Sequence, residues 1–169
     1  MTQKIFLIGM PGSGKTYWGS VIATLKGVPF IDLDAYIEEK EQKTIADFFR
    51  EHDEKAFREI ENAFLADIIE STEGCLIIAC GGGTPCYKDN MNMMKQNGIV
   101  IYLKAEISFI AKRLKNNKDG RPLLAGYDDL ETRLKQLLED RSTVYEQADH
   151  ILQADYVTAT TFDEILKHV

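Results

Sequence analysis

The sequence GMPGSGKT, at residues 9–16, constrains the fold of this chain more than any other feature. It follows a short apolar run typical of a β-strand, and it opens a run with helical periodicity that begins at Lys15. Glycines at this spacing let backbone N–H groups converge on phosphate oxygens, and the amino-terminal end of the helix adds its positive dipole. The segment therefore predicts a loop that binds a nucleoside triphosphate, in preference to an ordinary glycine-rich turn.

Each residue of this loop has an expected contribution. Lys15 is expected to bridge the β- and γ-phosphates, and Thr16 is expected to place its hydroxyl on Mg²⁺. We also assign four neighbouring residues to the nucleotide site: Gly12, Ser13, Gly14 and Tyr17.

Strand-like and helical runs alternate along the chain. We expect strands at residues 4–8, 29–33, 75–80, 99–103 and 150–152. We expect helices to begin near Lys15, Ala35, Ile45, Glu54, Lys88, Ile107, Asp129 and Phe162. Strands separated by helices predict a parallel sheet covered on both faces, within a single domain spanning residues 1–169. Ligands of such sheets bind beyond the carboxyl ends of the strands, so the functional residues should follow the strands.

Charge and cysteine content narrow the range of partners. The chain has 20 Lys and Arg against 27 Asp and Glu, a net charge of −7, which argues against broad binding of nucleic acid or of an anionic membrane. The cysteines, Cys75, Cys80 and Cys86, form no Cys-x-x-Cys pair and indicate reduced thiols in the cytoplasm. No cleavage pattern follows the first apolar run and no uncharged stretch could span a bilayer, so we expect neither a signal peptide nor a membrane anchor.

A magnesium carboxylate is expected at the end of a second strand. Glycines follow the strand expected at residues 75–80, so the candidates are Asp32 and Asp34, at the end of the strand expected at residues 29–33. Two residues apart on an extended chain, the two carboxylates would point to one face. One could then serve the metal and the other a substrate hydroxyl. The alternative is that Asp34 only caps the helix expected from Ala35, but beside a phosphate-binding loop we favour the functional interpretation.

Three consecutive glycines, Gly81, Gly82 and Gly83, follow the third expected strand. Such a run is costly in chain entropy, so it suits a place where a ligand approaches bare backbone. The alternative is a flexible loop.

Three arginines are candidates to hold anionic groups. Arg121 stands in a polar, glycine-bounded segment typical of a mobile lid, which we place at about residues 113–127 and which would deliver a cation to the transferred phosphate. Arg58 and Arg141 could each bind a carboxylate in bidentate geometry. The alternative for Arg121 is a surface side chain in an ordinary loop. The alternative for Arg58 and Arg141 is a solvent-facing side chain, and Glu54 stands four residues before Arg58 at ion-pair spacing.

Together these segments resemble the shikimate kinase family over essentially the whole chain. The matching segments are residues 9–16, 32–34, 57–61, 81–83 and 121–124, together with Arg141 and Tyr145. The resemblance implies an α/β fold with a five-stranded parallel sheet in three α/β/α layers, of the P-loop kinase type close to nucleoside-monophosphate kinases. It also implies a cytoplasmic monomer that uses ATP and Mg²⁺ to phosphorylate the 3-hydroxyl of the small molecule shikimate, giving shikimate 3-phosphate on the chorismate route to aromatic amino acids.

The resemblance also implies residue roles. Asp34 would contact the reacting hydroxyls, and Arg58 and Arg141 would bind the substrate carboxylate beside Gly81 and Gly82, with Glu61 orienting Arg58. Thr16 and, through water, Asp32 would hold Mg²⁺. The residues with catalytic roles would be Lys15, Asp34 and Arg121.

This sequence departs from the family pattern at two places. Members of the family often have an arginine against the adenine seven residues before the lid arginine, whereas here that position is Leu114 and Arg113 precedes it. We assign Arg113 to the nucleotide site, with either an extra residue before the lid or a changed adenine contact. After Arg141 the sequence reads Ser-Thr-Val before Tyr145, where a proline is common.

Other functions remain compatible with the residues alone. The first is another small P-loop kinase, acting on gluconate or a nucleoside monophosphate. The second is a nucleotide-dependent switch, although the sequence NNKD at residues 116–119 places its aspartate one residue too early for a guanine-reading motif. A catalytically inactive homologue is disfavoured because every required position is occupied.

Overall fold

The computed structural model describes residues 3–116 and 129–167 of the chain. Within them, five parallel strands form one sheet in the order β2-β3-β1-β4-β5. The strands are β1 (Lys4–Ile8), β2 (Phe30–Asp32), β3 (Leu76–Ala79), β4 (Gly98–Lys104) and β5 (His150–Gln153). Each lies within one residue of its expected range at either end. The predicted five-stranded parallel sheet is confirmed.

The helices begin close to where the sequence predicts them. They are α1 (Lys15–Lys26), α2 (Leu33–Glu41), α3 (Ile45–Glu51), α4 (Glu54–Ser71), α5 (Asn90–Asn97), α6 (Ile107–Asn116), α7 (Leu130–Tyr145) and α8 (Ala159–Ile165), with a 3₁₀ turn η1 (Thr84–Cys86) before α5. Side chains of Thr44 and Asp53 accept the first free N–H groups of α3 and α4. At α8, Thr158 and Thr161 form a reciprocal capping box, so this helix starts three residues before the expected Phe162.

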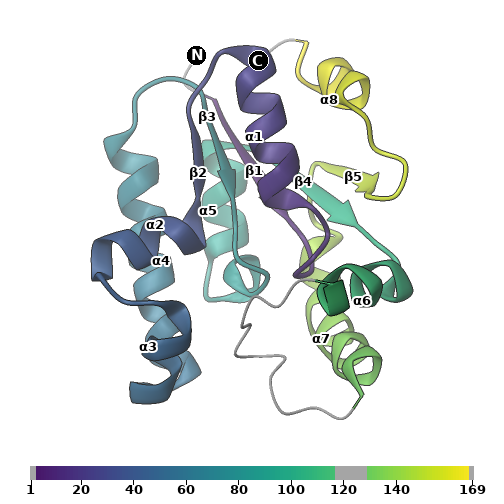
Figure 1. The fold of residues 1–169 in the computed structure, drawn as a ribbon. Helices are drawn as coiled ribbons and strands as arrows, with labels where there is room; N and C mark the ends of the chain where they lie inside the picture. The colour runs from purple at the N-terminus through teal and green to yellow at the C-terminus, as the bar shows by residue number, and fades with distance from the viewer. Residues whose placement is uncertain (1–2, 117–128, 168–169) are drawn as a thin grey trace.

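The helices cover both faces of the sheet, giving the predicted three layers (Figure 1). The crossover from β1 to β2 runs in the opposite direction across the sheet to the crossover from β3 to β4. Because parallel crossovers are right-handed, helices on the two connections must lie on opposite faces. Figure 1 accordingly shows α1 in front of the sheet, with α8 beside it, and α5 behind.

The core is continuous through the central strands. Every residue of β1 and β3 is buried, as expected for strands covered on both faces, whereas β5 at the sheet edge alternates between partly buried and exposed residues. The backbone N–H of Cys80 donates to the carbonyl oxygen of Leu7 at 3.0 Å, so β1 and β3 end side by side. The loops that follow these two strands therefore open at the switch point of the sheet, where ligands of such folds bind.

The start of α2 differs from the prediction. The helix begins at Leu33, and its N-cap is Asp32, whose Oδ1 accepts from the backbone N–H groups of Asp34 (3.1 Å) and Ala35 (3.3 Å). The expectation that Asp32 and Asp34 share one face of an extended chain is therefore wrong. Asp34 reaches its position from the first turn of the helix, because the cap ends the extended segment at Asp32.

A membrane-crossing segment is not found in the described residues: none of their helices is both long enough and apolar enough to traverse a bilayer.

Candidate active site

The phosphate-binding loop leaves β1 through Gly9, whose φ of 138° lies outside the range that side chains readily adopt. A Cβ there would stand 2.6 Å from the carbonyl oxygen of Leu103, so only glycine fits. Lys15 Nζ donates to the carbonyl oxygens of Gly9 (3.0 Å) and Met10 (2.9 Å). These bonds hold the ammonium group against the two ends of the loop.

The rest of the loop presents backbone to the site. Gly14, at φ 99°, is the N-cap of α1, and the first turn of that helix carries no acidic residue to oppose its positive end. The Ser13 side chain is fully buried, and its hydroxyl has no hydrogen-bond partner within the described part of the chain. The Ser13 backbone N–H donates within the loop to the carbonyl oxygen of Met10 at 3.2 Å, so the assignment of Ser13 to the nucleotide site stays a prediction. Tyr17 is 60% exposed and packs edge-on against Trp18.

Thr16 and Asp32, predicted from separate segments to hold a metal ion, lie together. Thr16 Oγ1 donates to Asp32 Oδ2 at 2.5 Å, while Oδ1 of the same carboxylate caps α2. A hydroxyl and a carboxylate are oxygen ligands of the kind that Mg²⁺ prefers beside nucleotide phosphates. No group of three or more His, Cys, Asp and Glu side chains suited to a metal occurs among the described residues, so the pair would share the ion with the phosphates.

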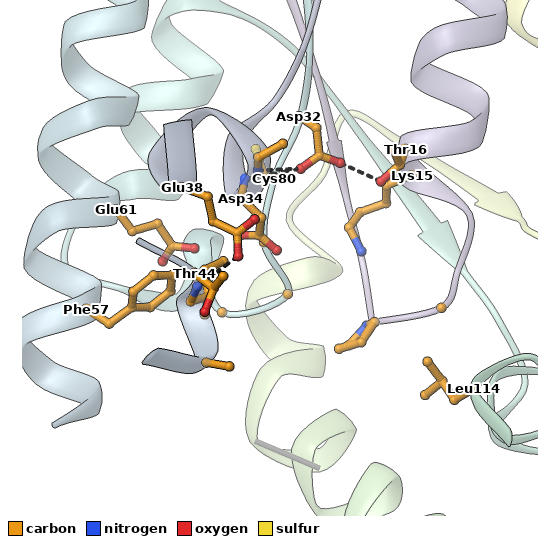
Figure 2. Close-up of a pocket in the computed structure, with 18 of the residues that line it drawn as sticks. Lys15, Thr16, Asp32, Asp34, Glu38, Thr44, Phe57, Glu61, Cys80 and Leu114 are labelled. Atoms are coloured by element: carbon orange, nitrogen blue, oxygen red, sulfur yellow. Dashed lines mark hydrogen bonds between the residues drawn. The ribbon is translucent and has the colours of Figure 1, made fainter. Parts of the chain in front are cut away.

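One cavity, of about 760 Å³, joins the phosphate-binding loop to the candidate acceptor residues (Figure 2). Figure 2 shows Lys15 and Thr16 on one side of it, across from Phe57 and Glu61 on α4. The predicted site residues that line it are Gly12, Gly14, Lys15, Thr16, Tyr17, Asp32, Asp34, Arg58, Glu61, Gly81, Gly82, Arg113 and Arg141. These residues, up to 129 positions apart in sequence, thus face a common space.

Asp34 stands between the two sides of the cavity. Burial, joined by the negative charges of Glu61 and Asp32, raises the pKa of its carboxyl from 3.8 to about 6, against the opposing pull of Lys15 and Arg58. A carboxylate with a pKa near 6 is mostly ionised at neutral pH and still accepts a proton readily. Asp34 therefore suits a general base at the acceptor hydroxyl.

Arg58 is buried, not solvent-facing. Its Nη1 donates to Glu61 Oε2 at 2.7 Å and its Nη2 donates to Glu54 Oε1 at 3.3 Å. Burial disfavours the charged guanidinium, but Glu61 and Glu54 outweigh that effect and raise the pKa of Arg58. The spacing to Glu54 was visible in the sequence, while the tighter pair is with Glu61, one turn further on. The ion pair with Glu61 thus holds Arg58 at the cavity wall.

Arg141 enters the cavity from α7 and is also buried, with 7% of its surface exposed. The residues Ser-Thr-Val, which follow Arg141 where the family commonly has a proline, continue α7 without interruption to Tyr145. Tyr145 is fully buried, and its hydroxyl donates to the carbonyl oxygen of Gly82 at 2.5 Å. Two guanidinium groups, from α4 and α7, therefore converge on one region of the cavity.

Comparison with known proteins identifies the family. A shikimate kinase family model matches residues 11–169. The chain belongs to the shikimate kinase family. A shikimate kinase from Bacteroides thetaiotaomicron is 41% identical over 154 residues, covering 90% of this chain and 87% of the relative.

Solved structures from the family share the whole fold. A shikimate kinase crystal structure from Bacteroides thetaiotaomicron matches with a TM-score of 0.90 and 38% identity, covering 98% of each chain. A shikimate kinase from Acinetobacter baumannii, solved in complex with shikimate, matches with a TM-score of 0.89 and 32% identity, covering 99% of this chain and 94% of that one. The predicted P-loop kinase fold is therefore confirmed over the length of the chain.

The glycine run of this family member serves its own side chains. A Cβ on Gly81 would stand 2.5 Å from Glu61 Oε1, one on Gly82 would stand 3.0 Å from Arg141 Nη1, and one on Gly83 would stand 2.4 Å from Arg58 Cζ. None of the three glycines has a positive φ. Their absent side chains leave room for the acceptor residues, an explanation that differs from both interpretations drawn from the sequence, a ligand against bare backbone and a flexible loop.

Of the two arginines predicted in the lid region, the structure describes Arg113 but not Arg121. Arg113, in the last turn of α6, lies over the Phe109 ring, and its Nη1 would stand 3.3 Å from a Cβ on Gly14. The next residue, Leu114, packs towards Gly12, so both positions flank the phosphate-binding loop. Arg121 and most of the expected lid, residues 117–128, lie outside the described residues.

The sequence analysis missed an apolar wall of the cavity. It is formed by Ile45 and Phe49 on α3 together with Phe57 on α4. The helical spacing of Ile45 and Phe49 was a usable signal for the wall. The helical spacing of Phe57 with Ile60 and Phe64 on α4, by contrast, indicates a residue of the core. Phe57 belongs to both the core and the apolar wall, since its side chain is buried and also lines the cavity.

Proposed function

We propose that this protein transfers the γ-phosphoryl group of ATP to the 3-hydroxyl of shikimate, forming shikimate 3-phosphate and ADP on the chorismate route. The observation that carries the proposal is the shared cavity, in which the phosphate-binding loop faces Asp34, Arg58 and Arg141. Two buried guanidinium groups suit a carboxylate, and a carboxylate with a raised pKa suits a hydroxyl. Shikimate carries both groups.

On the donor side, the backbone of the loop and the end of α1 bind the phosphates, and Lys15 neutralises charge that spreads over the transferred group. Thr16 and Asp32 would hold Mg²⁺, which when bound supplies further positive charge to the phosphates. Arg121, outside the described residues, stays predicted as a third cationic group.

On the acceptor side, Arg58 and Arg141 bind the shikimate carboxylate and so fix the ring in the cavity. Asp34 accepts the proton of the 3-hydroxyl as its oxygen attacks the γ-phosphorus, and the bond from that phosphorus to the bridging oxygen of ADP breaks. Positioning of the two reactants accounts for the catalysis without a covalent intermediate on the enzyme.

An acceptor screen tests this function. Release of ADP is measured with ATP and Mg²⁺ in the presence of shikimate, gluconate or AMP, and the Mg²⁺ is then removed with EDTA. Of the three acceptors, we expect only shikimate to support ADP release, and we expect this release to stop when EDTA removes the Mg²⁺. Turnover with gluconate or AMP but not with shikimate would overturn the proposal, and shikimate turnover that persists in EDTA would overturn the magnesium assignment.

We also propose that the protein acts as a cytoplasmic monomer on this small molecule and binds no nucleic acid. The free state of Cys75, Cys80 and Cys86 and the net charge of −7 support this. Size-exclusion chromatography with light scattering tests the oligomeric state. A monomer is expected to have a mass near 19.1 kDa, and twice that mass would contradict the proposal.

A further inference from the structure

Beneath the glycine run lies a hydrogen-bonded group that joins Arg58 and Glu61, which line the cavity, to Thr84, which does not. Its centre is Glu61, which is fully buried and uses its two carboxylate oxygens for different partners. Oε2 accepts from Arg58 Nη1 at 2.7 Å, and Oε1 accepts from Thr84 Oγ1 at 2.5 Å. Thr84 is also fully buried, at the start of η1. The hydroxyl and the guanidinium thus hold the same carboxylate from two sides.

Thr84 is itself held in place by the surrounding backbone and side chains. Its backbone N–H donates to the carbonyl oxygen of Gly81 at 3.1 Å, and its own carbonyl oxygen accepts from Asn90 Nδ2 at 2.8 Å. Asn90 Oδ1 in turn accepts from Asn62 Nδ2 at 2.5 Å, and Asn62 follows Glu61 on α4. The bonds form a closed circuit from α4 through α5 and η1 back to α4, so the hydroxyl donor is fixed relative to the carboxylate.

The space around Glu61 Oε1 makes this donor important. A Cβ on Gly81 would stand 2.5 Å from Oε1 and 2.9 Å from Asp34 Oδ1, so two carboxylates flank the same glycine. A hydroxyl that donates to a buried carboxylate stabilises its charge and fixes its torsion. Without that bond, Oε1 would face the buried carboxylate of Asp34 with no hydrogen-bond donor among the described residues, and the Glu61 carboxylate would rotate and move the Arg58 that it holds.

We propose that Thr84 is a positioning residue for the acceptor, because its hydroxyl holds Glu61 in the orientation that aims Arg58 at the substrate carboxylate. This inference rests on the proposed function, since it assigns Arg58 to shikimate. Thr84 acts only through Glu61, as it does not line the cavity.

The test compares Thr84→Val, which keeps the shape but lacks the hydroxyl, with Thr84→Ser, which retains it. We expect Thr84→Val to raise KM for shikimate about tenfold, because a charge-assisted bond is lost, and to leave KM for ATP within about twofold. Thr84→Ser is expected to restore KM for shikimate to within about threefold of wild type. As a stability control, Ile68→Val removes one buried methylene from α4, the helix that carries Glu61. It should leave the ratio of the KM for shikimate to the KM for ATP unchanged.

A double-mutant cycle separates positioning from general destabilisation. In a Glu61→Gln background, Thr84→Val is expected to change KM for shikimate by less than about twofold, since the carboxylate that it positions is gone. The proposal is overturned if Thr84→Val has wild-type KM values, if it raises both KM values equally, or if its effect persists in the Glu61→Gln protein. Those results leave wild-type turnover of shikimate intact, whereas an inactive wild type would overturn the proposed function itself.

Discussion

The donor and acceptor halves of the cavity are built in different ways. The phosphate-binding part of the donor half comes from one continuous segment, residues 9–16, which would bind through backbone groups and the end of α1, with Lys15 as its main side chain. The acceptor half is assembled from Asp34 on α2, Arg58 on α4 and Arg141 on α7, three helices that are far apart in sequence. The donor half depends on local backbone conformation, and the acceptor half depends on buried charged side chains that must hold one another.

The largest expected effect lies in the donor half. Lys15→Ala should lower kcat by about 10³-fold, because it removes a positive charge from the place where negative charge develops. The measurement is ADP release at saturating shikimate and ATP. Lys26→Ala, at the other end of α1 and paired with Asp163 at 2.9 Å, is the matched control and should keep wild-type kcat. Near-normal turnover in Lys15→Ala would refute the role of that lysine.

Asp34→Asn, in the acceptor half, should lower kcat by about 10²- to 10³-fold, because the base for the hydroxyl is lost. In the wild type, kcat/KM should fall as the pH drops through about 6, the raised pKa of Asp34, since protonation removes the base. Asp67→Asn, on the exposed side of α4, is the control and should leave the profile unchanged. Asp34→Asn with wild-type kcat would refute the assignment.

Asp34→Asn should also raise the free energy of unfolding at neutral pH. The pKa of Asp34 is 3.8 unperturbed and about 6 in the folded protein, so the folded state binds the proton more tightly than the unfolded state does. The resulting cost to stability is absent below about pH 4 and complete above about pH 6, where it reaches about 3 kcal/mol. Urea unfolding should therefore show Asp34→Asn more stable than wild type at pH 7.5 and equal to it at pH 3.5. Equal stability at both pH values would contradict a destabilising carboxylate.

Arg58→Ala should separate the two halves. We expect KM for shikimate to rise about 100-fold while KM for ATP rises less than about threefold, because the guanidinium binds only the acceptor. The variant also leaves Glu61 buried without its ion-pair partner, which should lower the free energy of unfolding by about 3 kcal/mol. Arg141→Ala tests the same carboxylate site without breaking that pair. Equal rises in both KM values for the two variants would contradict the carboxylate site.

The smallest expected effect comes from a methyl group. Gly83→Ala places a Cβ 2.4 Å from Arg58 Cζ and should raise KM for shikimate about tenfold by displacing that guanidinium. Gly74→Ala is the contrasting control, because Gly74 has a φ of 88° and nothing within 4 Å of its Cβ position. It should lower stability by about 1 kcal/mol and leave both KM values unchanged. An unchanged KM in Gly83→Ala would mean that Arg58 adapts without loss.

The fold could be predicted closely from hydrophobic patterning and capping residues. Strand β1 matched its expected bounds, and the caps at Thr44 and Asp53 placed the starts of α3 and α4 where the sequence predicted them. The prediction was wrong at Asp32, because a capping side chain stopped the strand sooner than residue preferences indicated. Such a cap depends on three neighbouring residues, a scale at which competing local conformations have similar energies.

Most of the residues assigned to the site from the sequence line one cavity, but only some of the contacts among its residues were indicated. Family resemblance indicated Glu61 as the partner of Arg58, whereas spacing alone indicated Glu54, and both bonds form. The apolar wall at Phe49 had a signal in helical spacing that was not used, whereas the hydroxyl of Thr84 had none. Thr84 and Glu61 are 23 residues apart in sequence, and hydrophobic periodicity does not predict a hydrogen bond between residues on different elements.

The sequence by itself determined the phosphate-binding loop, because eight successive residues restrict their own backbone angles and the glycines permit only one kind of turn there. Only the tertiary structure decided which charged groups share the acceptor half. The strand order and the handed crossovers bring residues of α2, α4 and α7 together beyond the carboxyl ends of the strands, and burial then makes each charge depend on its neighbour. Those dependencies arise between side chains that meet only after the chain has folded.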